Sequence, residues 1–187
     1  MIKHRIYEYI LNLSHKKIFQ VDIAKNLHCT EMYVSKIVKE LEKKGIIIKE
    51  NKNALAVINP FMICCALAFE KDKEKPLYFQ APDFEDTIQV LNKITKYYAL
   101  TCESANKIKK NEIPKIIQAH LLEKHIITLK ENFNQVPRPE NANLIVYPAN
   151  IMKFMYTNEK NGIKLANEWQ ILIDKIRENN LRNLDKI

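Results

Sequence analysis

Lysines recur along residues 31–43 at a spacing that would place them on one face of a helix. At 100° per residue, this face carries Met32, Lys36, Lys39 and Lys43, with Tyr33 and Ser35 on its flanks. A row of ammonium groups can neutralise the phosphates of a nucleic acid, while the other side chains can contact bases. The simpler alternative is a solvated helix face whose lysines bind nothing.

Motifs for cofactor or metal chemistry are missing from the sequence. The chain has only two glycines, Gly45 and Gly162, whereas a loop that cradles a nucleotide phosphate needs several close together. Its four cysteines form no CxxC pair, and we expect them to be free thiols. His120 and His125 are five residues apart, about 140° around a helix. We therefore expect neither a metal nor a cofactor.

Two groupings could suggest an active site. Residues 83–86 contain three carboxylates, but acidic residues in the first turn of a helix are explained by the helix dipole. His120 with Cys102 or Cys64 could form a nucleophile pair, although no family signature accompanies these separations. Neither Gly-Ser nor Asp-x-Asp occurs, so the elements needed for nucleotidyl transfer are missing as well. We predict that the protein is not an enzyme.

The length and charge of the chain limit what it can be. Its 187 residues, 47% of them hydrophobic, suffice for one large or two small domains. No apolar run approaches a membrane span, and the N-terminal segment has charges within its apolar pattern, so we expect a cytoplasmic protein. The net charge is +8, and residues 1–58 hold eleven Lys or Arg against six Asp or Glu. This basic excess at the front favours an acidic partner such as nucleic acid.

Residues 1–59 are predicted to form a small helical unit that ends in a hairpin. The apolar spacing predicts helices over residues 3–13 and 22–27, separated by the short extended segment "KIFQ". Thr30 is the expected N-cap of a third helix, and Gly45 its C-terminal stop. The core positions of the first helix are expected to be Ile6, Ile10 and Leu13, and those of the third Val34, Ile37, Val38 and Leu41. "IIIKE", "NKN" and "ALAVI" predict a β-hairpin.

This order of elements, and the segment "IAKNLHCTEMYVSKIVKELEKKGII", resemble the winged helix-turn-helix of MarR-like and related transcriptional regulators. The resemblance implies that residues 1–59 bind double-stranded DNA, with the third helix in the major groove. By analogy, the groove-facing residues are Met32, Tyr33, Ser35 and Lys36. The analogous backbone contacts are Lys39, Lys43, Lys49 and Lys52, and Thr30 completes the predicted DNA-binding set. The alternative is a winged helix that serves only protein contacts.

Residues 60–187 are predicted to form a second domain of α/β type, which makes the whole chain α+β. Asn59 and Pro60 begin an apolar helix that we expect to lie between the domains or at a dimer interface. "EKPLYFQAPDF" is predicted to be a loop, and Asp83 to cap a helix. Strands are expected at "YYALTC", "PKIIQAHLL", "NLIVYP" and "KFMYT", with a polar connector after the second. A C-terminal helix is expected to bury one face, made of Trp169, Leu172, Ile173 and Ile176.

The segments "YYALTCESANKI", "NLIVYP" and "NGIKLANEWQIL" resemble the C-terminal antitoxin domain of the AbiEi family. The matching residues are Tyr98, Leu100, Thr101, Ser104, Ala105, Pro148, Gly162, Ala166 and Leu172. Cys102 departs from the family pattern, because the family usually places Gly there. The resemblance implies a DNA-binding repressor paired with a nucleotidyltransferase-like toxin, and a second domain of nucleotidyltransferase-like shape without catalysis.

We therefore expect an autorepressing antitoxin of a type IV, AbiE-like toxin–antitoxin system that binds its operator as a homodimer. Two alternatives stay open. One is a MarR-like repressor whose second domain holds a small effector. The other is a plasmid or virus protein that binds DNA during replication or host interaction.

Overall fold

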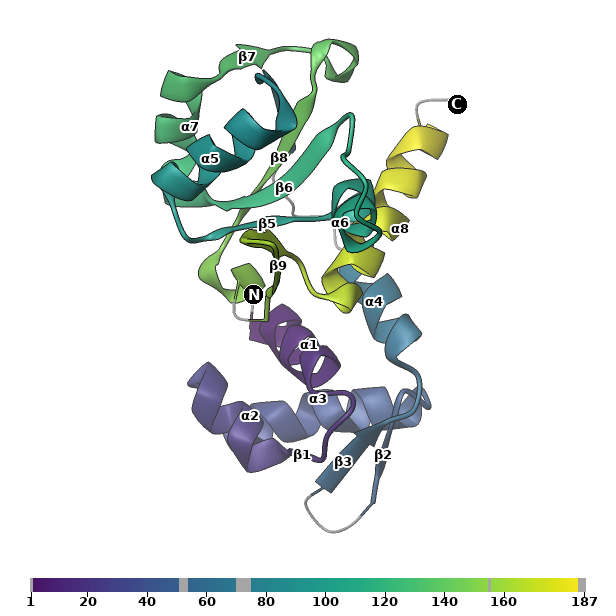
Figure 1. Ribbon diagram of the computed structural model, residues 1–187. Coiled ribbons are helices and arrows are strands. Elements are labelled where there is room, and N and C mark those ends of the chain that lie inside the picture. Colours follow the sequence, from purple (N-terminus) through teal and green to yellow (C-terminus); the bar gives the residue numbers. More distant parts are fainter. Residues whose placement is uncertain (1, 51–53, 70–74, 155, 185–187) are drawn as a thin grey trace. The chain divides into compact units, whose positions relative to one another are not determined.

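The front of the chain folds as three helices and a small antiparallel sheet, in the predicted order. The computed structural model describes residues 2–50, 54–69, 75–154 and 156–184. The elements are α1 (Ile2–Asn12), β1 (Ile18–Phe19), α2 (Gln20–Leu27), α3 (Glu31–Lys43), β2 (Ile47–Lys49) and β3 (Ala54–Val57), drawn in Figure 1. Strand β3 lies between β1 and β2 and pairs antiparallel with both.

Helix α3 begins and ends where the sequence predicts. The Thr30 hydroxyl accepts a hydrogen bond from the Tyr33 N–H at 3.3 Å, which confirms the N-cap. Gly45 adopts a φ of 66°, and the N–H groups of Gly45 and Ile46 donate to the carbonyls of Glu42 and Leu41. These two bonds form a Schellman motif. All four predicted core residues of α3 are buried.

Helix α2 ends in the same way, although it has no glycine. His28 takes the left-handed conformation, with a φ of 52°, and Cys29 donates to the Ala24 carbonyl at 3.0 Å. This stop gives the short turn that leads to Thr30. In α1 the buried apolar side chains are Ile6, Tyr7, Ile10 and Leu11. The predicted stripe was wrong at Leu13, which is only half-buried because α1 ends one residue before it.

Helix α4 (Pro60–Ala68) starts at the predicted cap, since the Asn59 side chain accepts from the Met62 N–H at 3.3 Å. It packs against α1. Two compact units are present: Met1–Glu70 with Ile176–Ile187, and Lys71–Lys175. Helix α4 thus belongs to the first unit, whereas the boundary predicted from sequence lies at residues 59 and 60. Its role between domains or in a dimer stays a prediction.

The second unit is built on a seven-stranded mixed sheet. The strands are β4 (Leu77–Gln80), β5 (Tyr98–Leu100), β6 (Ile117–Leu122), β7 (Asn134–Val136), β8 (Leu144–Ala149), β9 (Asn158–Lys160) and β10 (Ile163–Leu165). Their order is β7-β4-β8-β6-β5-β10-β9. The pairs β6–β8 and β5–β10 are parallel, and the other pairs are antiparallel. Together with the helices, the sheets confirm the predicted α+β class.

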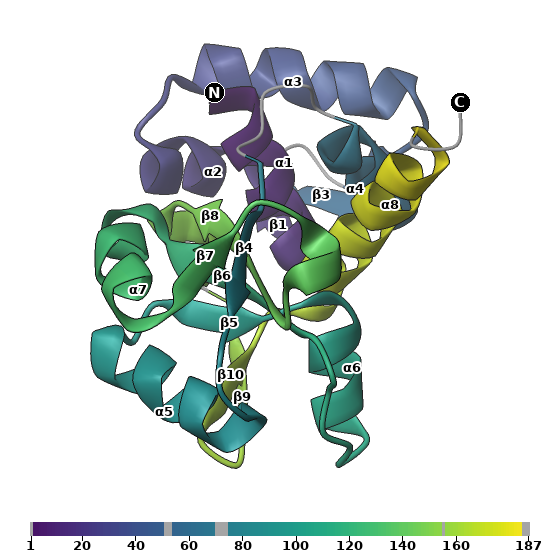
Figure 2. The same cartoon turned by 90° about the horizontal axis from the view of Figure 1, so that it is seen from above.

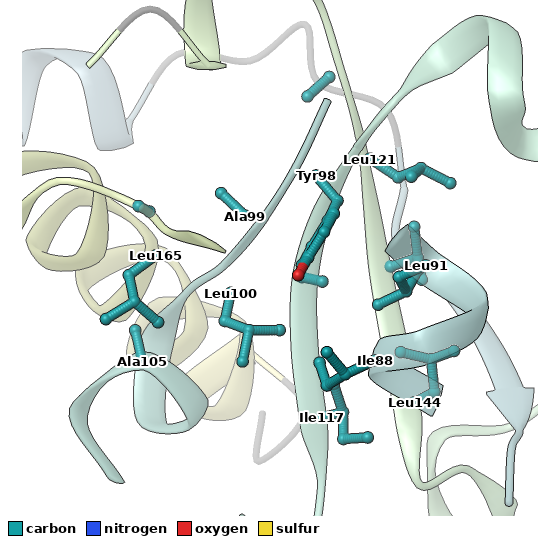
Figure 3. Close-up of a cluster of buried hydrophobic side chains, with 14 of the residues drawn as sticks. Ile88, Leu91, Tyr98, Ala99, Leu100, Ala105, Ile117, Leu121, Leu144 and Leu165 are labelled. Carbon is teal, nitrogen blue, oxygen red and sulfur yellow. The ribbon is translucent and has the colours of Figure 1, made fainter. Parts of the chain in front are cut away.

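Helices cover this sheet and close its core. They are α5 (Phe84–Ile94), α6 (Cys102–Lys109), α7 (Ile126–Asn132) and the part of α8 (Glu168–Leu184) that precedes Ile176, where the first unit resumes. Figure 2 shows α5 and α7 beside each other, and they are in contact. In Figure 3, Ile88 and Leu91 of α5 lie close to the strand that carries Ile117 and Leu121. Strand β6 is buried along almost its whole length, so both of its faces are covered.

Several predictions for the second unit were wrong. The supposed loop contains β4, which the sheet stabilises by pairing it with both β7 and β8. The polar connector contains α7 and β7. "KFMYT" is not a strand in its described residues, because the Lys153 N–H donates to the Asn150 carbonyl and the backbone forms a 3₁₀ turn over Ile151–Phe154. Its Met155 lies outside the described residues.

Among the helices that the structure describes, none is both long enough and apolar enough to cross a lipid bilayer.

Candidate nucleic-acid interface

Helix α3 exposes a stripe that combines one apolar residue with three lysines. Met32, Lys36, Lys39 and Lys43 are all exposed, and Met32 is 81% exposed. Their spacing of i, i+4, i+7 and i+11 keeps them in one row about 16 Å long, at a rise of about 1.5 Å per residue. The structure therefore brings together four residues of the predicted DNA-binding set.

The other residues of the predicted DNA-binding set do not belong to this exposed stripe. Tyr33 and Ser35 are half-buried, on the flanks of the stripe. The Thr30 hydroxyl is occupied as the helix cap. Lys49 is exposed on β2, and Lys52 lies outside the described residues.

The buried face of α3 holds this stripe in place. Val34, Ile37, Val38 and Leu41 are at most 3% exposed, so rotating the helix about its axis would expose apolar surface to water. Both ends of α3 are also fixed, by the Thr30 cap and the Gly45 stop. The lysine row therefore projects from a rigid support.

Ion pairs separate the charges of α3 into two groups. Glu40 accepts from Lys3 at 2.8 Å and from Lys44 at 3.1 Å, and these bonds lower the pKa of Glu40. Glu42 pairs with Lys49 at 3.3 Å. Lys49 is thus partly neutralised within the protein. Within the described residues, Lys36, Lys39 and Lys43 form no ion pair with an acidic side chain, so their positive charges stay available to an anion.

A second polar cluster, which the sequence did not predict, is buried in the second unit. The carboxylate of Asp174 on α8 pairs with His120 Nε2 of β6 at 2.7 Å. The same carboxylate accepts from the Thr101 hydroxyl and from the Gln170 amide, both at 2.6 Å. All four side chains are at most 6% exposed.

Charge compensation keeps Asp174 ionised in this cluster. Burial alone would raise the pKa of Asp174, but the His120 imidazole, Lys153 and the Thr101 hydroxyl together hold it below its usual value. Lys153 is half-buried, and its Nζ contacts the Gln170 side-chain oxygen at 2.5 Å. The cluster joins β6 and α8 through the contacts of this carboxylate with His120, Thr101 and Gln170.

The structure argues against a nucleophile pair of His120 with Cys64, which the sequence suggests as one candidate active site. His120 is paired with a carboxylate, and burial raises the pKa of the Cys64 thiol to about 11. A thiol with a raised pKa carries little thiolate at neutral pH and is a poor nucleophile.

One signal in the sequence could have indicated the cluster of Asp174, His120, Thr101 and Gln170: Gln170 and Asp174 stand four residues apart in an otherwise apolar part of α8. Of the face predicted there, only Ile173 is buried.

The acidic residues at 83–86 act as a helix start. The Asp83 carboxylate accepts from the Asp86 N–H at 2.9 Å and caps α5, as the dipole interpretation predicts. Over the described ranges, the structure contains no group of three or more His, Cys, Asp or Glu that could hold a metal ion.

No family model matches the chain, and neither does any curated protein. The MarR-like and AbiEi-like resemblances therefore stay predictions.

Proposed function

We propose that the first unit is a winged helix-turn-helix that binds double-stranded DNA with α3 in the major groove, and that the protein is an operator-binding transcriptional regulator. One observation carries this proposal. In the described residues, Lys36, Lys39 and Lys43 of the exposed row form no ion pair with an acidic side chain, while Glu40 and Glu42 of the same helix are paired with other lysines. A solvated face does not require this separation of charge, whereas phosphate binding benefits from it.

The order of elements supports the same function. The antiparallel strands β2 and β3 follow α3 directly, and Lys49 is the last residue of β2. In winged helices such a hairpin lies beside the DNA backbone, so it would add phosphate contacts to those of the helix. Since one recognition helix reads few base pairs, the protein would act as a homodimer on two half-sites. Helix α4 offers an uncharged surface for a second copy, because Phe61 and Met62 are about half exposed, at 53% and 46%.

The antitoxin part of the proposal has separate support. Cys102 follows β5 at the position where the AbiEi pattern usually has glycine, and its φ is 49°. Glycine is the residue that adopts this conformation without strain. The backbone therefore has the shape that the family's residue would suit, which favours an autorepressing antitoxin with a nucleotidyltransferase-like toxin as its functional counterpart. A regulator of this kind acts on DNA in the cytoplasm and needs no catalytic site of its own.

Binding-site selection would test the proposed function. The full chain would be incubated with duplexes that carry a random core of about 20 base pairs, long enough for two half-sites. Bound duplexes would be recovered and sequenced, and their affinities measured by fluorescence anisotropy. We expect an enriched, two-fold symmetric sequence that the protein binds at least about a thousandfold more tightly than a scrambled duplex. Recovery of unenriched sequences would refute an operator reader.

A further inference from the structure

Met32 is the most exposed large apolar side chain in the described residues, at 81%. It lies in the first turn of α3, two residues after the Thr30 cap. It is also the first member of the row that continues with Lys36, Lys39 and Lys43. The sequence assigns Met32 only to a general groove-facing surface and does not say what it would contact.

The position and chemistry of Met32 restrict its contact on DNA. Residues in the N-terminal part of a recognition helix reach base edges, while cations further along bind phosphates. A thioether cannot donate a hydrogen bond and accepts only weakly. The feature of the major groove that offers an apolar contact is the C5-methyl group of thymine. Because Met is flexible, it can adjust to that methyl group without a change in the α3 backbone.

We propose that Met32 is a specificity-determining residue that packs against a thymine methyl group in the major groove. This inference rests on the proposed function, since it requires α3 to enter the groove. It adds a defined base to that function: each half-site contains a thymine whose methyl group faces Met32. The contribution of one buried methyl group corresponds to about a fourfold change in affinity.

Deoxyuridine provides the test, because it pairs like thymidine but has no C5-methyl group. Each thymine of a selected duplex would be replaced singly by deoxyuridine, and binding measured by anisotropy for the wild type and for Met32→Ala. We expect one replacement per half-site to weaken wild-type binding about fourfold. The same replacement should leave Met32→Ala unaffected. Ile127→Ala removes another exposed apolar side chain, 73% exposed on α7, and should keep the wild-type sensitivity.

The outcomes separate this inference from the proposed function. Sequence-specific binding without any sensitivity to deoxyuridine, or with the same sensitivity in Met32→Ala, would overturn the role of Met32 and leave the operator reader standing. An absence of sequence-specific binding would overturn both. Met32 makes little contact with the protein core, so Met32→Ala should unfold at the wild-type urea concentration.

Discussion

The lysine row of α3 allows a quantitative prediction for DNA binding. The triple variant Lys36→Ala/Lys39→Ala/Lys43→Ala removes three exposed charges and leaves the buried face of the helix intact. We expect it to fold like the wild type, because alanine has a high helix propensity. DNA binding should weaken, and its dependence on salt should become flatter, since phosphate contacts release counterions.

The size of the effect follows from the number of contacts. Each lost phosphate contact lowers the slope of log affinity against log salt by about 0.9, so three lysines account for about 2.7. Over a fourfold rise in salt, from about 50 to 200 mM, the wild type should therefore lose about 40-fold more affinity than the triple variant. By contrast, Lys49→Ala should change the slope by less than one contact, because Glu42 already neutralises part of that charge.

Fluorescence anisotropy across this salt range is the appropriate assay, and net charge is the main confounding variable. The variant Lys93→Ala/Lys124→Ala/Lys130→Ala removes the same number of charges from exposed positions of the second unit. If the salt slopes of the two triple variants fall equally, the effect comes from overall charge and the lysine row is not the DNA-binding face. A reduced slope in the α3 variant alone would agree with the proposed contacts.

Three further predictions concern the fold. The pKa of Asp174 is held below its usual value near 4, so the stabilising effect of the carboxylate is present at neutral pH and is lost as the pH falls below about 4. Asp174→Ala should lower the free energy of unfolding by about 3–5 kcal/mol at neutral pH and flatten this acid dependence. Urea denaturation at several pH values would measure both effects. Cys102→Gly should be more stable than Cys102→Ala by about 1 kcal/mol in the same assay, because the φ at this position is positive. In an ordinary helix position the alanine variant is the more stable one. A more stable alanine variant here would contradict a strained backbone at Cys102. Thr30→Ala should lower the unfolding free energy by about 0.5–1 kcal/mol, while Thr30→Ser keeps the cap; equal losses in both would exclude the hydroxyl as its source.

The sequence predicted the first unit well because its signals are local. The apolar period, the Thr30 cap and the Gly45 stop each act within a few residues, and together they place α3 within its observed limits. The hairpin is equally local, since β2 and β3 are neighbours in the chain. The position of the lysine row then follows from the buried face of the same helix.

The second unit was harder to predict because its sheet depends on distant pairings. Strand β4 pairs with β7 and β8, more than fifty residues away, and its four residues carry no clear alternation. The His120–Asp174 pair joins positions 54 residues apart. No local rule brings such groups together, and only the polar spacing of Gln170 and Asp174 indicated that this face of α8 is more than apolar.

The distribution of charge in the first unit argues for DNA binding more strongly than the net charge of +8 does. Lys3 and Lys44 are both bound to Glu40, and Lys49 to Glu42, so these lysines act as internal counterions. They neutralise two of the three acidic residues of α3, Glu40 and Glu42, so the repulsion that these two carboxylates would exert on a phosphate backbone is reduced, while Glu31 stays in the first turn of the helix. A basic protein whose positive charges served only solubility would have no need for this arrangement. Because Lys3, Lys44 and Lys49 already pair with Glu40 and Glu42, these two carboxylates leave the lysine row of α3 to an external anion.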